Sequence, residues 1–92
     1  MKITVNFLSI SDDDVYLIGY KLKLSPTERA ILCEIAKGKG ASIEDLLPIL
    51  SVGVSRGNIA VHINSINKKA ENISGRKLIL FDSGKYILNP YM

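Results

Sequence analysis

An amphipathic segment in the second half of the chain constrains the fold most strongly. Its apolar residues recur every three or four positions, which places them on one stripe of a helix. They are Ile59, Ile63, Ile66 and Ala70. Ser55 is a favourable N-cap, so the pattern predicts a helix from Ser55 to about Glu71. The polar residues of the segment fall mostly on its other sides and are expected to face solvent: Asn58, Asn64, Ser65, Asn67 and Lys68.

A second helix is predicted from a local start signal. The residues 25–28, Ser-Pro-Thr-Glu, have the form of a capping box with proline at the first helical position. The helix is expected to run to about Lys37, with Ile31 and Ile35 one turn apart on its buried side. Gly38 and Gly40 follow as stop signals.

Between these two helices the sequence predicts a third. Ser42 is its expected N-cap, and Glu44 and Asp45 are favourably placed in its first turn. Pro48 removes a backbone donor and clashes with the preceding turn of a helix. We therefore expect this helix to be short, or kinked near Leu47.

The first 24 residues read as a small antiparallel sheet. Alternating apolar residues predict one strand over Lys2–Leu8, and two more are expected at Val15–Ile18 and Tyr20–Leu24. Ser11–Asp14 is a polar turn, and Gly19 is a bend between the second and third strands.

The C-terminal end predicts a β-hairpin. Its strands are expected at Leu78–Phe81 and Tyr86–Leu88, joined by a turn over Asp82–Lys85. Tyr86 is expected to fold back onto the core.

The order of these elements defines a fold class. We predict one α+β domain over residues 1–92, a winged helix-turn-helix, since 92 residues suffice for a single core. Residues 1–24 form the N-terminal antiparallel sheet, residues 25–71 the three helices, and residues 76–89 the hairpin wing. In such a fold the third helix can enter the DNA major groove while the wing contacts the adjacent backbone or minor groove.

Few residues support catalysis or metal binding. Cys33 and His62 are each the sole residue of their type, and a zinc site needs three or four ligands. Cys33 falls in an apolar helical stretch, which is typical of a structural cysteine. The acidic run at 12–14 lacks the spacing of a calcium loop, and the glycines around Lys39 lack that of a phosphate-binding loop. We expect a binding protein without catalytic residues, metal or cofactor.

Hydropathy indicates the cellular location of the protein, and the charge distribution indicates the kind of partner it binds. No apolar run approaches the length of a membrane helix, and no secretion signal is evident, so a cytoplasmic location is expected. The net charge is +3 overall, but residues 1–54 carry six Lys/Arg and seven Asp/Glu, whereas residues 55–92 carry six and two. The second half is therefore the basic one, as expected for contact with a polyanion.

Several segments resemble one known family. Residues 24–28, Leu-Ser-Pro-Thr-Glu, are similar to the start of the first helix in OmpR/PhoB-type response-regulator output domains. Residues 59–63 and 66–69 resemble the family's recognition helix, and residues 84–88 resemble its wing. The segments lie in the family's order and spacing over nearly the whole chain. The resemblance implies a DNA-binding transcription regulator, with double-stranded DNA as its partner.

The resemblance also implies which residues contact DNA. The third helix reads bases and grips phosphates, so the expected site comprises Arg56, Asn58, Val61, His62, Asn64, Ser65, Asn67, Lys68 and Lys69, with Ala60 on the same face and Lys85 on the wing. Val61 is suited to a thymine methyl group, and Asn58 or Asn64 to adenine. Arg56, His62, Lys68 and Lys69 are candidate phosphate contacts.

Three departures from the family weaken the expected DNA affinity. Ser65 and Asn67 stand where the family has arginines in the recognition helix, and Asp82 stands at the position of the wing arginine. Lys85 compensates in part. No receiver domain precedes this domain within the 92 residues, so control by phosphorylation is not expected in the chain as given.

Protein partners are the alternative reading. The stretch from Leu46 to Val54 is rich in apolar residues, which favours self-association, and in the family this region touches RNA polymerase. A homodimer and contacts with RNA polymerase or another protein are therefore also expected. The alternative to a DNA-binding regulator is a winged-helix interaction domain with weak or no DNA binding.

Overall fold

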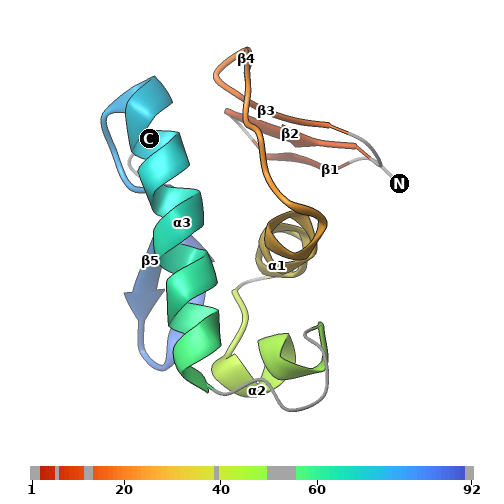
Figure 1. Ribbon diagram of the computed structural model, residues 1–92, viewed down its shortest axis with the longest axis vertical. Helices are drawn as coiled ribbons and strands as arrows, with labels where there is room; N and C mark the ends of the chain where they lie inside the picture. Colours follow the sequence, from red (N-terminus) through yellow and green to blue (C-terminus); the bar gives the residue numbers. More distant parts are fainter. Residues whose placement is uncertain (1–2, 6, 12–13, 39, 50–55, 91–92) are drawn as a thin grey trace.

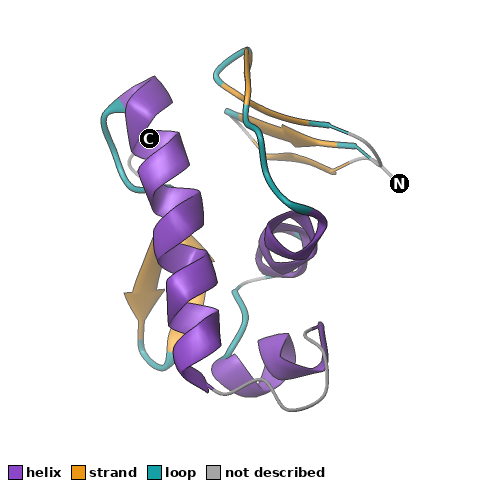
Figure 2. Ribbon diagram, viewed as in Figure 1, coloured by secondary structure: helices purple, strands orange, loops and turns teal. Residues whose placement is uncertain are grey.

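A computed structural model describes residues 3–5, 7–11, 14–38, 40–49 and 56–90. The chain order is a four-stranded sheet, three helices and a C-terminal hairpin, which confirms the predicted winged helix-turn-helix. Figure 1 shows the longest helix standing between the hairpin on one side and the first helix on the other, with the sheet beyond. Figure 2 shows the same arrangement by type of element.

The N-terminal sheet is an antiparallel meander of short strands. The strands are β1 (Ile3–Val5), β2 (Leu8–Ile10), β3 (Val15–Leu17) and β4 (Tyr20–Lys21), paired in chain order. Alternate residues of β2 and β3 are buried, so one face of the sheet covers the core.

The prediction of a single strand over Lys2–Leu8 is wrong. Val5 pairs with Leu8 across an antiparallel register, so the chain reverses between them. The apolar residues change from odd positions (Ile3) to even ones (Leu8, Ile10) at this reversal. The predicted strand at Val15–Ile18 also ends one residue early, because Ile18 and Gly19 form the turn with φ values of 52° and 80°.

The first helix, α1 (Pro26–Ala36), begins as predicted. The hydroxyl of Ser25 accepts the Glu28 N–H at 3.2 Å, and the Glu28 carboxylate accepts the Ser25 N–H at 2.8 Å. This reciprocal pair satisfies two backbone donors that the helix itself leaves free.

The second helix, α2 (Ile43–Leu46), is short and continues as a 3-10 turn over Leu47–Ile49. This confirms the effect expected of Pro48. Leu46 is buried, and Leu47 and Ile49 pack partly against the core. Leu46 is therefore a core residue, Leu47 and Ile49 are half-buried at its edge, and residues 50–54 lie outside the described residues.

The third helix, α3 (Arg56–Ser74), ends three residues later than predicted. Its end is set by Gly75, which has a φ of 76° and donates its N–H to the Glu71 carbonyl at 2.8 Å. A glycine in this left-handed conformation is a common helix stop. The predicted cap Ser55 lies outside the described residues.

The wing consists of β5 (Ile79–Asp82) and β6 (Lys85–Leu88). The predicted turn over Asp82–Lys85 is confirmed: its central residues are Ser83 and Gly84, with φ values of 52° and 82°, and Asp82 and Lys85 also pair as strand residues. Two residues with positive φ match the twist of antiparallel strands. Tyr86 packs against the core as predicted and meets Phe81 edge to face, with ring centroids 4.9 Å apart.

The segment before α2 joins the wing. Ala41 and Tyr86 exchange two backbone hydrogen bonds, at 2.8 and 2.9 Å. Gly40, with a φ of 108°, makes this approach possible, because a Cβ there would lie 2.8 Å from Cγ2 of Ile87. The wing is thereby tied to the segment that leads into α2.

Glu28 also links α1 to α3. Its side chain is nearly buried and accepts a hydrogen bond from Nζ of Lys69 at 2.7 Å. Burial raises the pKa of Glu28, but hydrogen bonds from Lys69, the Ser25 backbone and Ser65 outweigh it and lower that pKa to about 2. The charged form of Glu28 is therefore stabilised in the folded protein.

We predict that Glu28→Gln removes a pH-dependent part of the stability. Because the pKa of Glu28 falls from its usual 4.5 to about 2 on folding, its contribution is present above pH 4.5 and is lost as the pH falls towards 2. The shift corresponds to about 3 kcal/mol at neutral pH. Urea unfolding from pH 7 to pH 2 should show a steep loss for the wild type and a flatter profile for the variant.

Glu34→Gln serves as the matched control for this measurement. Glu34 lies on the same helix and forms an exposed pair with Lys37 at 3.1 Å, which is expected to contribute at most about 0.5 kcal/mol. Equal pH profiles for the wild type and Glu28→Gln would contradict the assignment.

Candidate nucleic-acid interface

The two sides of α3 differ sharply in exposure. Ile59, Ile66 and Ala70 are fully buried and Ile63 is 5% exposed, which confirms the predicted apolar stripe. On the opposite side Val61 is 63% exposed, and three neighbouring residues, Ala60, Asn64 and Lys68, are also exposed. An exposed valine on a helix that buries other apolar residues is available to a partner.

The wing lies beside this helix, as Figure 1 shows. A shallow groove runs along the exposed side of α3 and reaches the segment that leads into β5. Its lining residues are Val61, Asn64, Ser65, Asn67, Lys68, Glu71 and Lys77. The surface thus combines a helix face and the base of a hairpin, which is the arrangement of a winged-helix DNA interface.

Asn67 lies at the bottom of this groove, nearly buried, so the prediction that it faces solvent is wrong. It is 7% exposed. Its Oδ1 accepts the Ile79 N–H at 2.7 Å, and its Nδ2 donates to the Ile79 carbonyl at 3.0 Å. The side chain therefore satisfies both backbone groups of the first wing residue and joins α3 to β5. Asn67 is therefore not available as a DNA contact.

Ser65 and Lys69 lie on the side of α3 that faces α1. Lys69 is bound to Glu28, and Ser65 is half-buried and contributes to the low pKa of Glu28. Both residues interact with Glu28 through their polar groups, and Ser65 also lines the groove. His62, one turn before Ser65 and Ile66, is also half-buried.

Lys85 on the wing lies near two acidic residues. It pairs in register with Asp82 across the hairpin, and it contributes to a lowered pKa of Asp45. The main cause of that lowered pKa is the hydrogen bonding with Ser42 at the start of α2. The positive charge of Lys85 is thus partly balanced within the molecule.

Two basic residues that were not predicted as DNA contacts lie just after α3. Arg76 and Lys77 follow directly after the end of α3, and both are exposed. Their backbone is held in place: Nδ2 of Asn89 donates to the Lys77 carbonyl at 2.8 Å, and the Ser74 hydroxyl donates to the Arg76 carbonyl at 3.2 Å. Gly75 is the sequence signal that could have identified them, because a helix that ends there is followed directly by this basic pair.

Two predicted contacts remain without a side-chain description. The backbone of Arg56 and Asn58 forms the first turn of α3, but their side chains lie outside the described residues.

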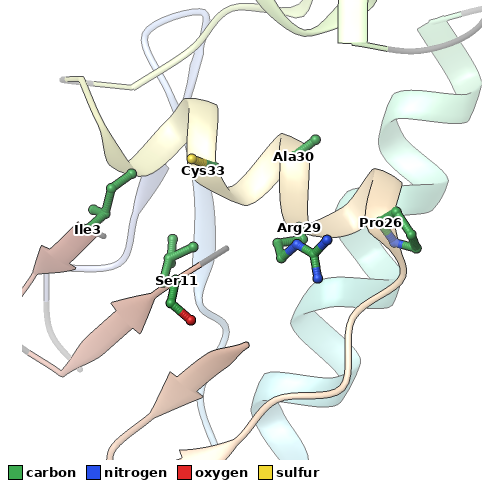
Figure 3. A pocket seen from close by; sticks show the side chains of 7 residues that line it. Ile3, Ser11, Pro26, Arg29, Ala30 and Cys33 are labelled. Atoms are coloured by element: carbon green, nitrogen blue, oxygen red, sulfur yellow. The ribbon is translucent and has the colours of Figure 1, made fainter. Parts of the chain in front are cut away.

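The remaining candidate for chemistry is Cys33. It is half-buried and lines a cavity between α1 and the N-terminal sheet, together with Ile3, Ser11 and Arg29 (Figure 3).

Within the described ranges, no three His, Cys, Asp or Glu side chains are placed to hold a metal ion. None of the helices in the described part of the chain has the length and apolar character needed to cross a membrane.

Comparison with known proteins supports the fold. No family model and no curated protein matches the sequence. Among solved structures, the DNA-binding domain of the response regulator AdeR, in complex with an intercistronic region, shares 20% identity at a TM-score of 0.78, covering 94% of this chain and 96% of that one. The Klebsiella pneumoniae RstA DNA-binding domain, in complex with the RstA box, shares 26% identity at a TM-score of 0.72, covering 97% of both chains.

A third similar structure links the fold to the family predicted from the sequence. DrrB, an OmpR/PhoB homologue from Thermotoga maritima, shares 26% identity at a TM-score of 0.77. The match covers 96% of this chain, which spans only 44% of DrrB. The chain therefore has the fold of an OmpR/PhoB-type DNA-binding domain, as its sequence motifs predicted.

We predict that Asn67→Ala destabilises the fold by about 2–4 kcal/mol, because it leaves the buried N–H and C=O of Ile79 without partners. Asn64→Ala, one turn away on the exposed side, should change stability by less than about 0.5 kcal/mol. Urea denaturation of both variants measures the difference. Similar midpoints for the two would show that Asn67 does not join the helix to the wing.

Proposed function

We propose that this chain is a DNA-binding module of a transcription regulator. It would place the exposed side of α3 in the major groove and set the wing against the adjacent backbone or minor groove. The observation that carries the proposal is the outward side of α3, which is free of the rest of the molecule and lies next to a terminal hairpin.

The comparisons support the same function. Two of the similar structures are DNA-binding domains described in complex with DNA, one with an intercistronic region and one with the RstA box. Each is matched over nearly its whole length, so the likeness includes the helix and the wing.

The proposed contacts divide into two kinds. Val61 and Asn64 lie on the exposed side of α3 at positions suited to base edges. Lys68 and Lys77 line the same groove further along and are suited to phosphates. We further propose that Arg56 and Asn58 contact DNA at the start of α3, and that His62 and Lys85 contact it at the edges of the interface.

Further partners follow from this function. We propose that residues 1–92 act as one domain, that the module works in the cytoplasm where its DNA lies, and that it binds DNA as a homodimer. RNA polymerase is a proposed partner for the region between α2 and α3. Static light scattering, without and with DNA, tests the homodimer.

A salt titration tests DNA binding. We predict that affinity for a 20-base-pair duplex falls steeply between about 50 and 200 mM salt, because each phosphate contact releases counterions. Lys68→Ala combined with Lys77→Ala should lower the slope of log K against log salt by about two units. Fluorescence anisotropy of labelled duplex measures both quantities.

Lys37→Ala is the matched control for charge. Lys37 caps α1 and pairs with Glu34, so its removal changes the net charge without touching the proposed interface. If Lys37→Ala reduced the slope as much as one of the two interface substitutions, the binding would reflect net charge alone.

A protein-interaction domain is the second candidate. It is favoured by the ion pair that holds Lys69 to Glu28 and by the position of Asp82 opposite Lys85, since both reduce the positive charge available to DNA. Negligible binding to duplex at both salt concentrations would support this candidate and refute the first.

A further inference from the structure

The side of α1 that faces the N-terminal sheet takes no part in the proposed DNA interface. Two cavities lie there, of about 210 and 280 Å³, and Arg29 lines both of them. Figure 3 shows Arg29 projecting from α1 at the smaller cavity. Pockets for drug-sized ligands usually measure about 300–1,000 Å³, so these two cavities suit a smaller molecule.

The larger cavity has a basic lining. Its described lining includes three cationic side chains, those of Lys21, Lys23 and Arg29, and one carboxylate, that of Asp14. Asp14 is paired with Lys21 at 3.1 Å, so the charges of these two residues offset each other. The described lining therefore has a positive charge overall, which favours an anionic group in this cavity.

Arg29 is suited to hold such a group. Its side chain is half-buried, and charges attract more strongly where less water surrounds them. A guanidinium group can bind a carboxylate or a phosphate through two parallel hydrogen bonds. Lys23 is exposed and adds a second cation to the same cavity.

The smaller cavity is largely apolar. Ile3 and Ile10 line it from the sheet, and Pro26 and Ala30 line it from α1. Such a lining favours a short hydrocarbon group, which loses its contact with water there. Because Arg29 lines both cavities, one molecule can place a charged head group at Arg29 and an apolar body in the smaller cavity.

We propose that these two cavities bind a small organic anion with a short apolar body. Its carboxylate or phosphate head contacts Arg29 and Lys23, and its body lies between α1 and the sheet, against Ile3 and Ile10. The described lining of the cavities includes no residue proposed to contact DNA, so this binding is independent of the proposed function.

The test uses three probes of one shape: hexanoate, hexanol and hexylammonium, which differ in the charge of the head group. Cys33 is the sole cysteine of the chain and lines the smaller cavity, so its alkylation by iodoacetamide reports occupancy. At constant ionic strength, hexanoate should halve the alkylation rate at a concentration on the order of 1 mM. Hexanol should need at least about tenfold more, and hexylammonium should have no effect.

Amide NMR spectra of labelled protein give a second measurement that does not depend on the thiol. Hexanoate should shift the amide signals of Ser11, Arg29 and Ala30, and the absence of such shifts overturns the proposal whatever the reactivity of Cys33. Equal binding of hexanoate and hexanol, or tighter binding of hexylammonium, overturns the assignment to an anion. This comparison also covers any effect of Asp12 and Asp13, which lie outside the described residues. Hexyl phosphate in place of hexanoate distinguishes a phosphate head from a carboxylate.

Variants assign the binding to residues. Arg29→Gln should weaken hexanoate binding by about tenfold, because a charged hydrogen-bond donor is lost. Lys23→Ala should weaken it by about threefold, and its exposed position means that the variant should fold like the wild type. Lys37→Ala, which removes one charge at the end of α1, is the matched control and should leave the affinity unchanged. An equal loss in Lys23→Ala and Lys37→Ala would overturn the proposed site.

Discussion

The apolar stripe of α3 is the constraint on which the rest of the structure depends. This one helix packs against α1, α2, the N-terminal sheet and the wing. Its rotation about its own axis is fixed by burial of Ile59, Ile66 and Ala70 on one side. Two polar links reinforce the same rotation, one from Lys69 to Glu28 on α1 and one from Asn67 to the first wing residue. The outward side of the helix is therefore set by what the inward side buries.

Elements with a local physical cause could be predicted from the sequence. The capping box at Ser25 and Glu28, and the disruption of α2 by Pro48, follow from hydrogen bonds and steric clashes within a few residues. The buried stripe of α3 follows from spacing alone. Features that depend on partners distant in sequence were missed. Asn67 looks like any polar residue on a helix, and only the position of Ile79, twelve residues later, shows that it is a buried link.

The candidate site was predictable only in outline for the same reason. Spacing in the sequence assigns to the exposed face of a helix every residue that points away from the buried stripe. Neighbouring elements of the fold nevertheless cover the residues at the edges of that face. Ser65 and Lys69 lie on the margin that faces α1, whereas Val61 and Asn64 lie at its exposed centre. Conversely, Lys77 joins the surface because the helix ends at Gly75 and the chain turns back along the groove. The prediction assigned an earlier end to the helix and so left this lysine out.

The charge that the protein offers to DNA is smaller than its sequence suggests. Residues 55–92 carry six Lys/Arg, but Lys69 is paired with Glu28, and Lys85 lies opposite Asp82 in the hairpin. Nonspecific affinity comes mainly from phosphate contacts, so each internal pair lowers it. The proposed contacts of Val61 and Asn64 with base edges do not depend on these pairs, because neither side chain carries a charge. A domain built in this way would bind bulk DNA weakly, and a larger share of its affinity for a cognate site would come from direct contacts with the bases.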